Sequence, residues 1–180
     1  MIAIEPYDSA WPARFAIEAA RIRRSFGDLA LRVEHVGSTA VPGLAAKPVI
    51  DIQVSVPSLA PMGRFIERLS EIGYGHASLG AVDLVYPFFT KPAAWPSTHH
   101  VHLCVVGSEH ERRHLAFRDY LRRHPLAAAE YLTLKHELAA AHHGATIESR
   151  ECYSLAKTEF VSSVVARACA EGYPLNRDDA

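Results

Sequence analysis

Apolar and polar residues alternate along several short stretches of the chain, and this alternation predicts β-strands. The clearest stretch covers residues 49–56 and has one apolar and one mostly polar face. The apolar face consists of Ile50, Ile52, Val54 and Val56, and the other of Val49, Asp51, Gln53 and Ser55. Further strands are predicted over residues 31–36, 81–86 and 98–106, and the proline-rich residues 87–96 are long enough for a mobile lid.

Apolar residues recur at helical spacing in most of the remaining chain. Helices are predicted over residues 9–26, 61–73, 109–124, 125–138 and 146–171. Residues 1–172 are therefore expected to form one α/β domain with a small mixed sheet. Helices should cover the apolar face of that sheet, and the C-terminal helices should close one side of a cleft. Residues 173–180 are expected to form a tail.

Composition narrows the class of protein. The chain has 180 residues, 49% hydrophobic and 22% charged, as expected for a compact domain with a sizeable core. Its net charge of −1 makes no strong case for a nucleic-acid partner, and its apolar runs fall short of the roughly 18 residues that a membrane span needs. Three cysteines without paired spacing indicate neither a disulfide framework nor a zinc knuckle. A cytoplasmic protein is expected, and no feature indicates an oligomeric state.

A short segment between two predicted strands offers groups that bind phosphate. Gly37 lacks the Cβ that would block close approach of a ligand, and Ser38 and Thr39 offer hydroxyl and N–H groups. Asp51 follows on the polar face of the next strand. A carboxylate there is placed to ligate a divalent cation that bridges the protein and a nucleotide.

Two histidines share one face of the strand predicted over residues 98–106, because alternation places His100 and His102 on the same side. If this strand lies beside the one that carries Asp51, two imidazoles and a carboxylate converge. That set suits a transition metal better than magnesium. The alternative is that both histidines are half-buried and bonded to backbone or solvent.

Cations lie on the predicted buried face of the last helix. Arg150, Tyr153 and Lys157 share that face, and Lys135 lies at the edge of the apolar stripe of the preceding helix. A buried cation needs an anionic partner or a route to water. These side chains therefore either reach solvent or supply positive charge to a phosphate or acidic ligand.

Residues 35–51, His-Val-Gly-Ser-Thr-Ala-Val-Pro-Gly-Leu-Ala-Ala-Lys-Pro-Val-Ile-Asp, closely resemble the signature of the GrpB family. The resemblance extends to residues 6–12, 99–103 and 117–122 and to Tyr131, Lys135, Arg150, Tyr153 and Lys157. It implies a nucleotidyltransferase-like fold. In that superfamily Gly-Ser is followed by two carboxylates one residue apart, whereas Gln53 holds the second position here and brings no charge for a second metal. The His-x-His strand takes the place of a third carboxylate.

The expected function is that of a metal-dependent nucleotidyltransferase-like protein that binds a nucleotide or another phosphorylated small molecule. Asp51 and Lys157 are the expected catalytic residues, and Asp51, His100 and His102 the expected ligands of a divalent metal ion, a transition metal or magnesium. The expected phosphate-binding residues are Gly37, Ser38, Thr39, Lys47, Lys135, Arg150 and Tyr153. One alternative is a catalytically inactive nucleotide- or cofactor-binding accessory module, and another is a phosphohydrolase with a His-Asp metal centre.

Overall fold

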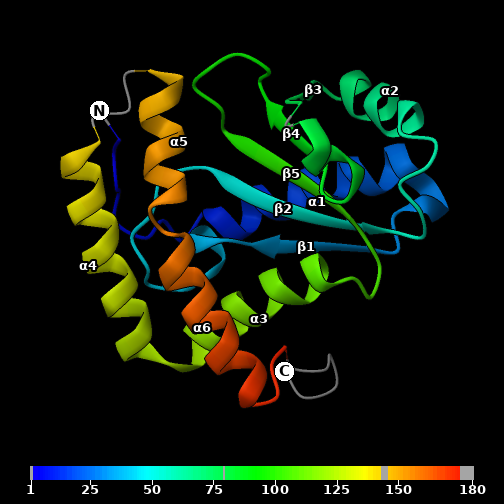
Figure 1. The fold of residues 1–180 in the computed structure, drawn as a ribbon. Coiled ribbons are helices and arrows are strands. Elements are labelled where there is room, and N and C mark those ends of the chain that lie inside the picture. The colour runs from blue at the N-terminus through cyan, green and yellow to red at the C-terminus, as the bar shows by residue number, and fades with distance from the viewer. Residues whose placement is uncertain (1, 79, 143–145, 175–180) are drawn as a thin grey trace.

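The computed structural model describes residues 2–78, 80–142 and 146–174, without the side chains of residues 147 and 150. Within these residues, five strands form one mixed sheet in the order β1-β2-β5-β4-β3 (Figure 1). The strands are β1 (Arg32–Val36), β2 (Ile50–Val56), β3 (Gly75–His76), β4 (Phe88–Lys91) and β5 (His99–Val105). Strand β2 pairs antiparallel with β1 and parallel with β5, and β4 runs antiparallel to both β5 and β3.

Helix α1 (Trp11–Phe26) lies behind the sheet in Figure 1, and it covers the apolar face of the sheet together with α2 (Gly63–Glu71). Alternate residues of β2 and β5 form this face, and six of them are buried: Ile50, Ile52, Val54, Val56, Val101 and Leu103. Ile22 and Phe26 of α1 and Phe65 and Leu69 of α2 belong to the same core. The predicted apolar face of residues 49–56 is therefore confirmed, and so is its cover of helices.

The C-terminal part of the chain is helical and lies on the other side of the sheet. It comprises α3 (Glu109–Arg123), α4 (Pro125–Ala141), α5 (Ile147–Leu155) and α6 (Thr158–Ala170). A second apolar core joins α3, α4 and α6 to the segment after β1, with Val41, Leu44, Phe117, Leu121, Tyr131 and Val164 among its members. Tyr173 packs on Tyr120, with ring centroids 5.6 Å apart. Residues 175–180 of the predicted tail lie outside the described residues, and the domain boundary at residue 172 stays a prediction.

The strand predicted over residues 81–86 is wrong. A short 3-10 helix, η3 (Gly80–Leu84), stands in its place, and its apolar side chains are exposed. The strand that pairs with β5 on the side away from β2 is β4, which lies inside the segment predicted as a loop over residues 87–96. Phe89 of β4 is fully buried opposite Val101, so it supplies a core contact that residues 81–86 do not make.

The single helix predicted over residues 146–171 is interrupted. Helix α5 ends at Leu155 and α6 begins at Thr158, with Ala156 and Lys157 in the turn between them. No glycine or proline marks the break. Helix α6 packs on α3 through Val164, whereas α5 buries Tyr153 beside the cavity described in the next section. A straight helix could not make both contacts, so tertiary packing sets the turn.

The length and apolar character of the helices decide whether any of them could cross a membrane. Among the residues that the structure describes, none of the helices is both long enough and apolar enough to cross a membrane. The cytoplasmic location stays a prediction from the sequence.

Candidate functional site

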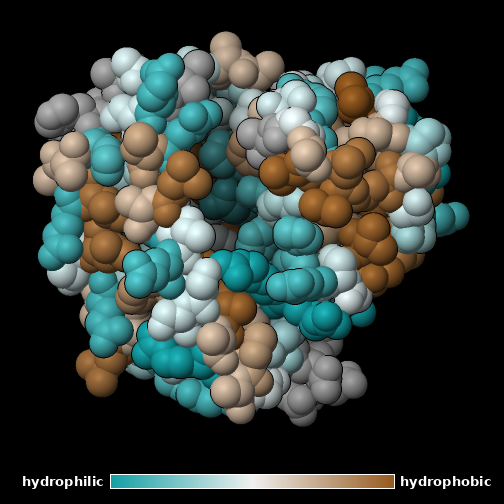
Figure 2. Space-filling model, viewed as in Figure 1, coloured by the Kyte–Doolittle hydropathy of each residue, from teal (hydrophilic) through white to brown (hydrophobic). Residues whose placement is uncertain are grey.

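A cavity of about 280 Å³ opens between the polar face of the sheet and the C-terminal helices. Figure 2 shows it as a hollow beside α5 with hydrophilic residues on its floor. Of the eleven predicted site residues, nine line this cavity. Gly37 does not, because it lies behind Asp51, and the side chain of Arg150 lies outside what the structure describes. The structure thus brings together residues that are more than 100 positions apart in the sequence.

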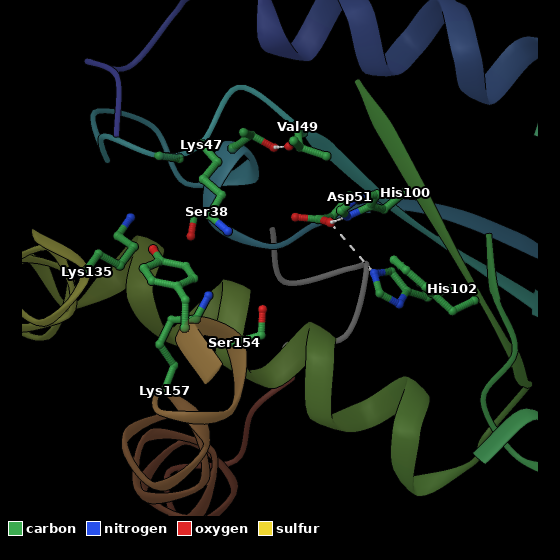
Figure 3. Close-up of a pocket in the computed structure, with 13 residues that line it drawn as sticks. Ser38, Lys47, Val49, Asp51, His100, His102, Lys135, Ser154 and Lys157 are labelled. Atoms are coloured by element: carbon green, nitrogen blue, oxygen red, sulfur yellow. Dashed lines mark hydrogen bonds and ion pairs between the residues drawn. The ribbon is translucent and has the colours of Figure 1, made fainter. Parts of the chain in front are cut away.

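Asp51 lies on the sheet wall of the cavity, opposite its register partner His100 (Figure 3). Its Oδ1 is 3.2 Å from Nδ1 of His100 and 3.7 Å from Nε2 of His102. Burial works to raise the pKa of Asp51, but the interactions with both histidines outweigh it and hold that pKa well below the usual range. Asp51 is therefore an anion at any pH near neutrality.

Gly37 makes room for this carboxylate. Its φ of +70° lies in the left-handed region, where a side chain strains the backbone. A Cβ at this position would also overlap Oδ2 of Asp51. Gly37 was predicted to allow close approach by a ligand, and the structure shows close approach by Asp51 instead. Contact between Gly37 and a phosphate stays a prediction.

The hydroxyl of Thr39 is committed to bonds inside the protein. It donates to the carbonyl oxygen of Val49 at 3.2 Å and lies 3.0 Å from Nε2 of His35. Burial lowers the pKa of His35 to about 4, so its imidazole is neutral at pH 7 and stacks on Phe15. Ser38, by contrast, turns toward the cavity, where its side chain hydrogen-bonds the phenol of Tyr131. Of the two hydroxyls, that of Ser38 is the better placed for a ligand.

The wall opposite Asp51 gathers three of the four lysines of the chain. Lys47 comes from the segment before β2, Lys135 from α4, and Lys157 from the turn between α5 and α6 (Figure 3). The ammonium groups of Lys47 and Lys157 lie 4.0 and 4.2 Å from the ring centroid of the buried Tyr153, a cation–π arrangement that holds both near the cavity. We call this cavity the lysine pocket.

Two of these lysines have lowered pKa values, because their surroundings disfavour the charged form. Burial lowers the pKa of Lys135 to about 7, and repulsion from Lys157 adds to the effect. Burial likewise lowers the pKa of Lys157 to about 8, with further repulsion from Lys47. Nζ of Lys135 donates to the carbonyl oxygen of Ala45. An anion in the pocket would offset the repulsion and raise both pKa values.

Gln53 points to the same side of the sheet as Asp51 but does not reach the lysine pocket. It is fully buried beneath α3, where its Nε2 donates to the carbonyl oxygen of Glu111 at 3.4 Å. Its Oε1 lies 3.0 Å from Nδ1 of His114, whose pKa burial lowers to about 4. Asp51 is thus the one carboxylate among the described residues that line the pocket.

The predicted metal ligands are close together but do not form a ready metal site. Within the described part of the chain, no three His, Cys, Asp or Glu side chains are arranged so that they could hold a metal ion. Asp51, His100 and His102 have the right chemistry for a transition metal, yet both imidazoles are turned to the carboxylate. The divalent ion therefore stays a prediction.

Two residues that shape the site were not among those predicted from the sequence. Glu111 is buried and ties the loop after β5 to the sheet, because it accepts hydrogen bonds from the Ser55 hydroxyl at 2.5 Å and from the Gly107 N–H at 2.6 Å. The Ser-x-x-Glu pattern that starts at Ser108 was the available signal. Tyr86 stacks on His102, with ring centroids 5.2 Å apart, and no sequence pattern indicated this contact.

Comparison with known proteins places the chain in a family. Its sequence matches the family described as GrpB protein over residues 1–167. The chain belongs to the GrpB family. One relative in this family, UPF0157 protein PA4798 of Pseudomonas aeruginosa, is 40% identical over 172 residues, which cover 94% of this chain and 68% of that protein. A dephospho-CoA kinase of Mycolicibacterium paratuberculosis is 35% identical over 157 residues, but these cover 74% of this chain and only 39% of that protein.

Solved structures agree with this assignment. GrpB from Enterococcus faecalis matches the GrpB-family chain with a TM-score of 0.81 at 35% identity, covering 94% of this chain and 98% of that one. A cytoplasmic RNA terminal U-transferase matches with a TM-score of 0.50 at 17% identity, covering 76% of this chain and 43% of that one. The second likeness shows the fold alone. Together they confirm the predicted family and the nucleotidyltransferase-like fold.

Proposed function

We propose that this GrpB-family chain is a nucleotidyltransferase-like protein that binds a nucleotide or a related phosphate ligand in the lysine pocket. The observation that carries the proposal is the convergence of Lys47, Lys135 and Lys157 from three parts of the chain. The chain also has fifteen arginines, and none of those with a described side chain lines the pocket. Cations gathered in this way repel one another, and a polyanion relieves that repulsion.

The residues on the two walls would act differently on such a ligand. The ammonium groups would neutralise phosphate charge, and the Ser38 hydroxyl would donate to a phosphate oxygen. Asp51 is a poor proton acceptor because its pKa is so low, so it would orient an attacking group through a hydrogen bond. Any transfer reaction would then rest on positioning and charge neutralisation.

A second candidate is a binding module without catalysis. The glutamine at position 53 favours it, because the pocket then has one carboxylate among its described residues where the superfamily pattern has two nearby. The relative named dephospho-CoA kinase suits a nucleotide or cofactor ligand for either candidate. Release of pyrophosphate from bound ATP separates them, because a transferase produces it in the presence of an acceptor and a binding module does not.

Replacement of Lys157 by methionine tests the binding proposal. Lys157→Met keeps the length of the apolar stem and deletes the charge, so affinity for tripolyphosphate should fall by about 1.5–3 kcal/mol, roughly tenfold to 150-fold in Kd. Stability should stay the same or rise, because a half-buried cation is removed. Calorimetric titration and thermal melting measure the two effects.

The matched control is Arg24→Met, which removes an exposed cation from α1 on the far side of the sheet. Its affinity for tripolyphosphate should equal that of the wild type. Equal affinity in Lys157→Met as well would remove Lys157 from the site. Failure of the wild type to bind tripolyphosphate or ATP would sink the proposed function.

A further inference from the structure

A second cavity, about 570 Å³ in volume, opens beside the lysine pocket. The two cavities share a border formed by Lys47, Phe88, His100, His102 and Ser154. Beyond this border, Tyr86 and Trp95 line the second cavity alone. We call it the aromatic cleft, defined by Tyr86, Phe88 and Trp95. Its volume is twice that of the lysine pocket, and the proposed function assigns no ligand to it.

The two cavities differ in charge. Lys135, Lys157 and Asp51 line the lysine pocket only. Among the described residues that line the aromatic cleft beyond the shared border, the one with a charge is Glu151. Its carboxylate repels phosphate, and three aromatic rings offer apolar surface instead. The cleft is therefore suited to an uncharged group.

The aromatic wall is held in place before any ligand arrives. The ring of Tyr86 stacks on His102 and on His110, with centroids 5.2 and 5.0 Å apart and interplanar angles of 19° and 18°. Its hydroxyl lies 2.6 Å from Nδ1 of His114 on α3. These contacts fix Tyr86 although it follows a segment with exposed apolar residues. A preformed flat wall lowers the entropy that a planar ligand loses on binding.

Trp95, unlike Tyr86, is largely exposed, with 54% of its surface open to solvent. A tryptophan ring exposed at the mouth of a cavity can stack on a planar apolar group. Figure 2 shows hydrophobic residues gathered beside the hollow, on the side away from α5. A small planar apolar molecule would cover part of the exposed surface of Trp95.

The reactive groups lie between the two cavities. His100 and His102 line both, and both contact Asp51. Two reactants in a group-transfer site must approach the reacting centre from different sides. A phosphate ligand in the lysine pocket and a second molecule in the aromatic cleft would meet at these side chains.

We propose that the aromatic cleft binds a second ligand, an uncharged molecule with a planar apolar body, while the phosphate ligand occupies the lysine pocket. The position of the phosphate ligand in this arrangement rests on the proposed function. The molecule in the aromatic cleft would differ from the phosphate ligand that the lysines bind. An aromatic part of the phosphate ligand itself is the competing occupant, and it predicts a different pattern of competition.

The chain offers a reporter for this cleft. It has two tryptophans, and Trp11 is buried with an Nε1 that makes no hydrogen bond. Trp11→Phe therefore breaks no hydrogen bond and leaves Trp95 as the single fluorescent indole. The probes are two uncharged aromatic molecules, adenosine and 4-nitrobenzyl alcohol. Saturation-transfer NMR on the wild type, Trp95→Ala and Leu126→Ala gives a second readout, where Leu126 is an exposed control on α4.

The expected result is that at least one probe quenches Trp95 and shows saturation transfer with the wild type and with Leu126→Ala. Trp95→Ala should weaken this binding at least tenfold while tripolyphosphate affinity stays unchanged. Neither saturating tripolyphosphate nor saturating ATP should displace the probe. These results together would support a separate second ligand.

Three results would overturn the inference. Displacement by ATP but not by tripolyphosphate would show that the base of the phosphate ligand fills the cleft. Binding of neither probe, or equal binding to Trp95→Ala, would show that the cleft takes no planar apolar molecule. Tripolyphosphate binding is measured separately, so its absence in the wild type would count against the proposed function even where a probe binds.

Discussion

The alternation of residues along strand β2 produces two faces, and the two faces differ in whether neighbouring residues are buried alike. On the apolar face Ile52 and Val54 are both fully buried in one continuous core. On the polar face Asp51 lines the lysine pocket, whereas Gln53 is fully buried beneath α3. Alternation decides on which side of the sheet a residue lies, and the helix that packs there decides whether a polar residue is open to a ligand.

The largest expected effect comes from the apolar face. Ile52→Ala should lower the free energy of unfolding by about 2–5 kcal/mol, because it opens a cavity in the core. Ile17→Ala removes the same atoms from an exposed site on α1 and should stay within about 0.5 kcal/mol of the wild type. Urea denaturation compares the two. A loss below about 1 kcal/mol in Ile52→Ala would contradict a continuous core on this face.

The buried polar residue should give the next largest effect. Gln53→Asp places a carboxylate beneath α3. The carbonyl oxygen of Glu111 and the imidazole of His114 then lose the amide to which they are hydrogen-bonded, so the free energy of unfolding should fall by about 1–3 kcal/mol. Magnesium affinity should not increase, because the side chain does not line the pocket. Ser154→Asp places the same charge at an exposed position in the pocket and should cost less than about 0.5 kcal/mol.

Urea melts and magnesium titration of both variants test this difference. Tighter magnesium binding by Gln53→Asp at unchanged stability would show that residue 53 reaches the pocket after all. The comparison of Asp51 with Gln53 would then fail.

Metal titration tests the part of the polar face of the sheet that is open to the lysine pocket. The wild type should bind Zn²⁺ more tightly than Mg²⁺, because imidazoles accompany the single carboxylate. His102→Ala should weaken Zn²⁺ binding by about tenfold, or ~1.4 kcal/mol. His136→Ala is the control, since this histidine is exposed on α4. Equal Zn²⁺ affinity in the wild type and His102→Ala would rule out His102 as a ligand.

The smallest expected effect is a dependence of stability on pH. Folding lowers the pKa of Lys135 from 10.5 to about 7, so the unfolded chain binds more protons between these values. The stability of the wild type relative to Lys135→Met should therefore rise from about pH 7 to about pH 9.5, by about 1 kcal/mol or more. Thermal melts across this range measure it. Saturating tripolyphosphate should flatten the difference, and a difference that falls with pH would contradict the lowered pKa.

Several features followed from the sequence alone, and all of them are local. The segment of residues 35–51 identified the family, and alternation with a period of two placed Asp51 on one face of its strand and His100 with His102 on one face of another. Side-chain direction in a strand depends only on position along that strand. The meeting of Asp51 with the two histidines needed one further assumption, that the strands are neighbours, and the register confirmed it.

The remaining features depended on contacts between distant segments. Residues 81–86 and 87–91 are both plausible strands by composition, and only the fit of Phe89 against Val101 selected β4. The turn at Lys157 has no local signal, because α5 and α6 pack on different surfaces. Gln53 follows the same alternation as Asp51, and only the placement of α3 removed it from the pocket. Local pattern sets the direction of a side chain, but what lies in that direction is set by packing between elements far apart in sequence, which no local pattern encodes.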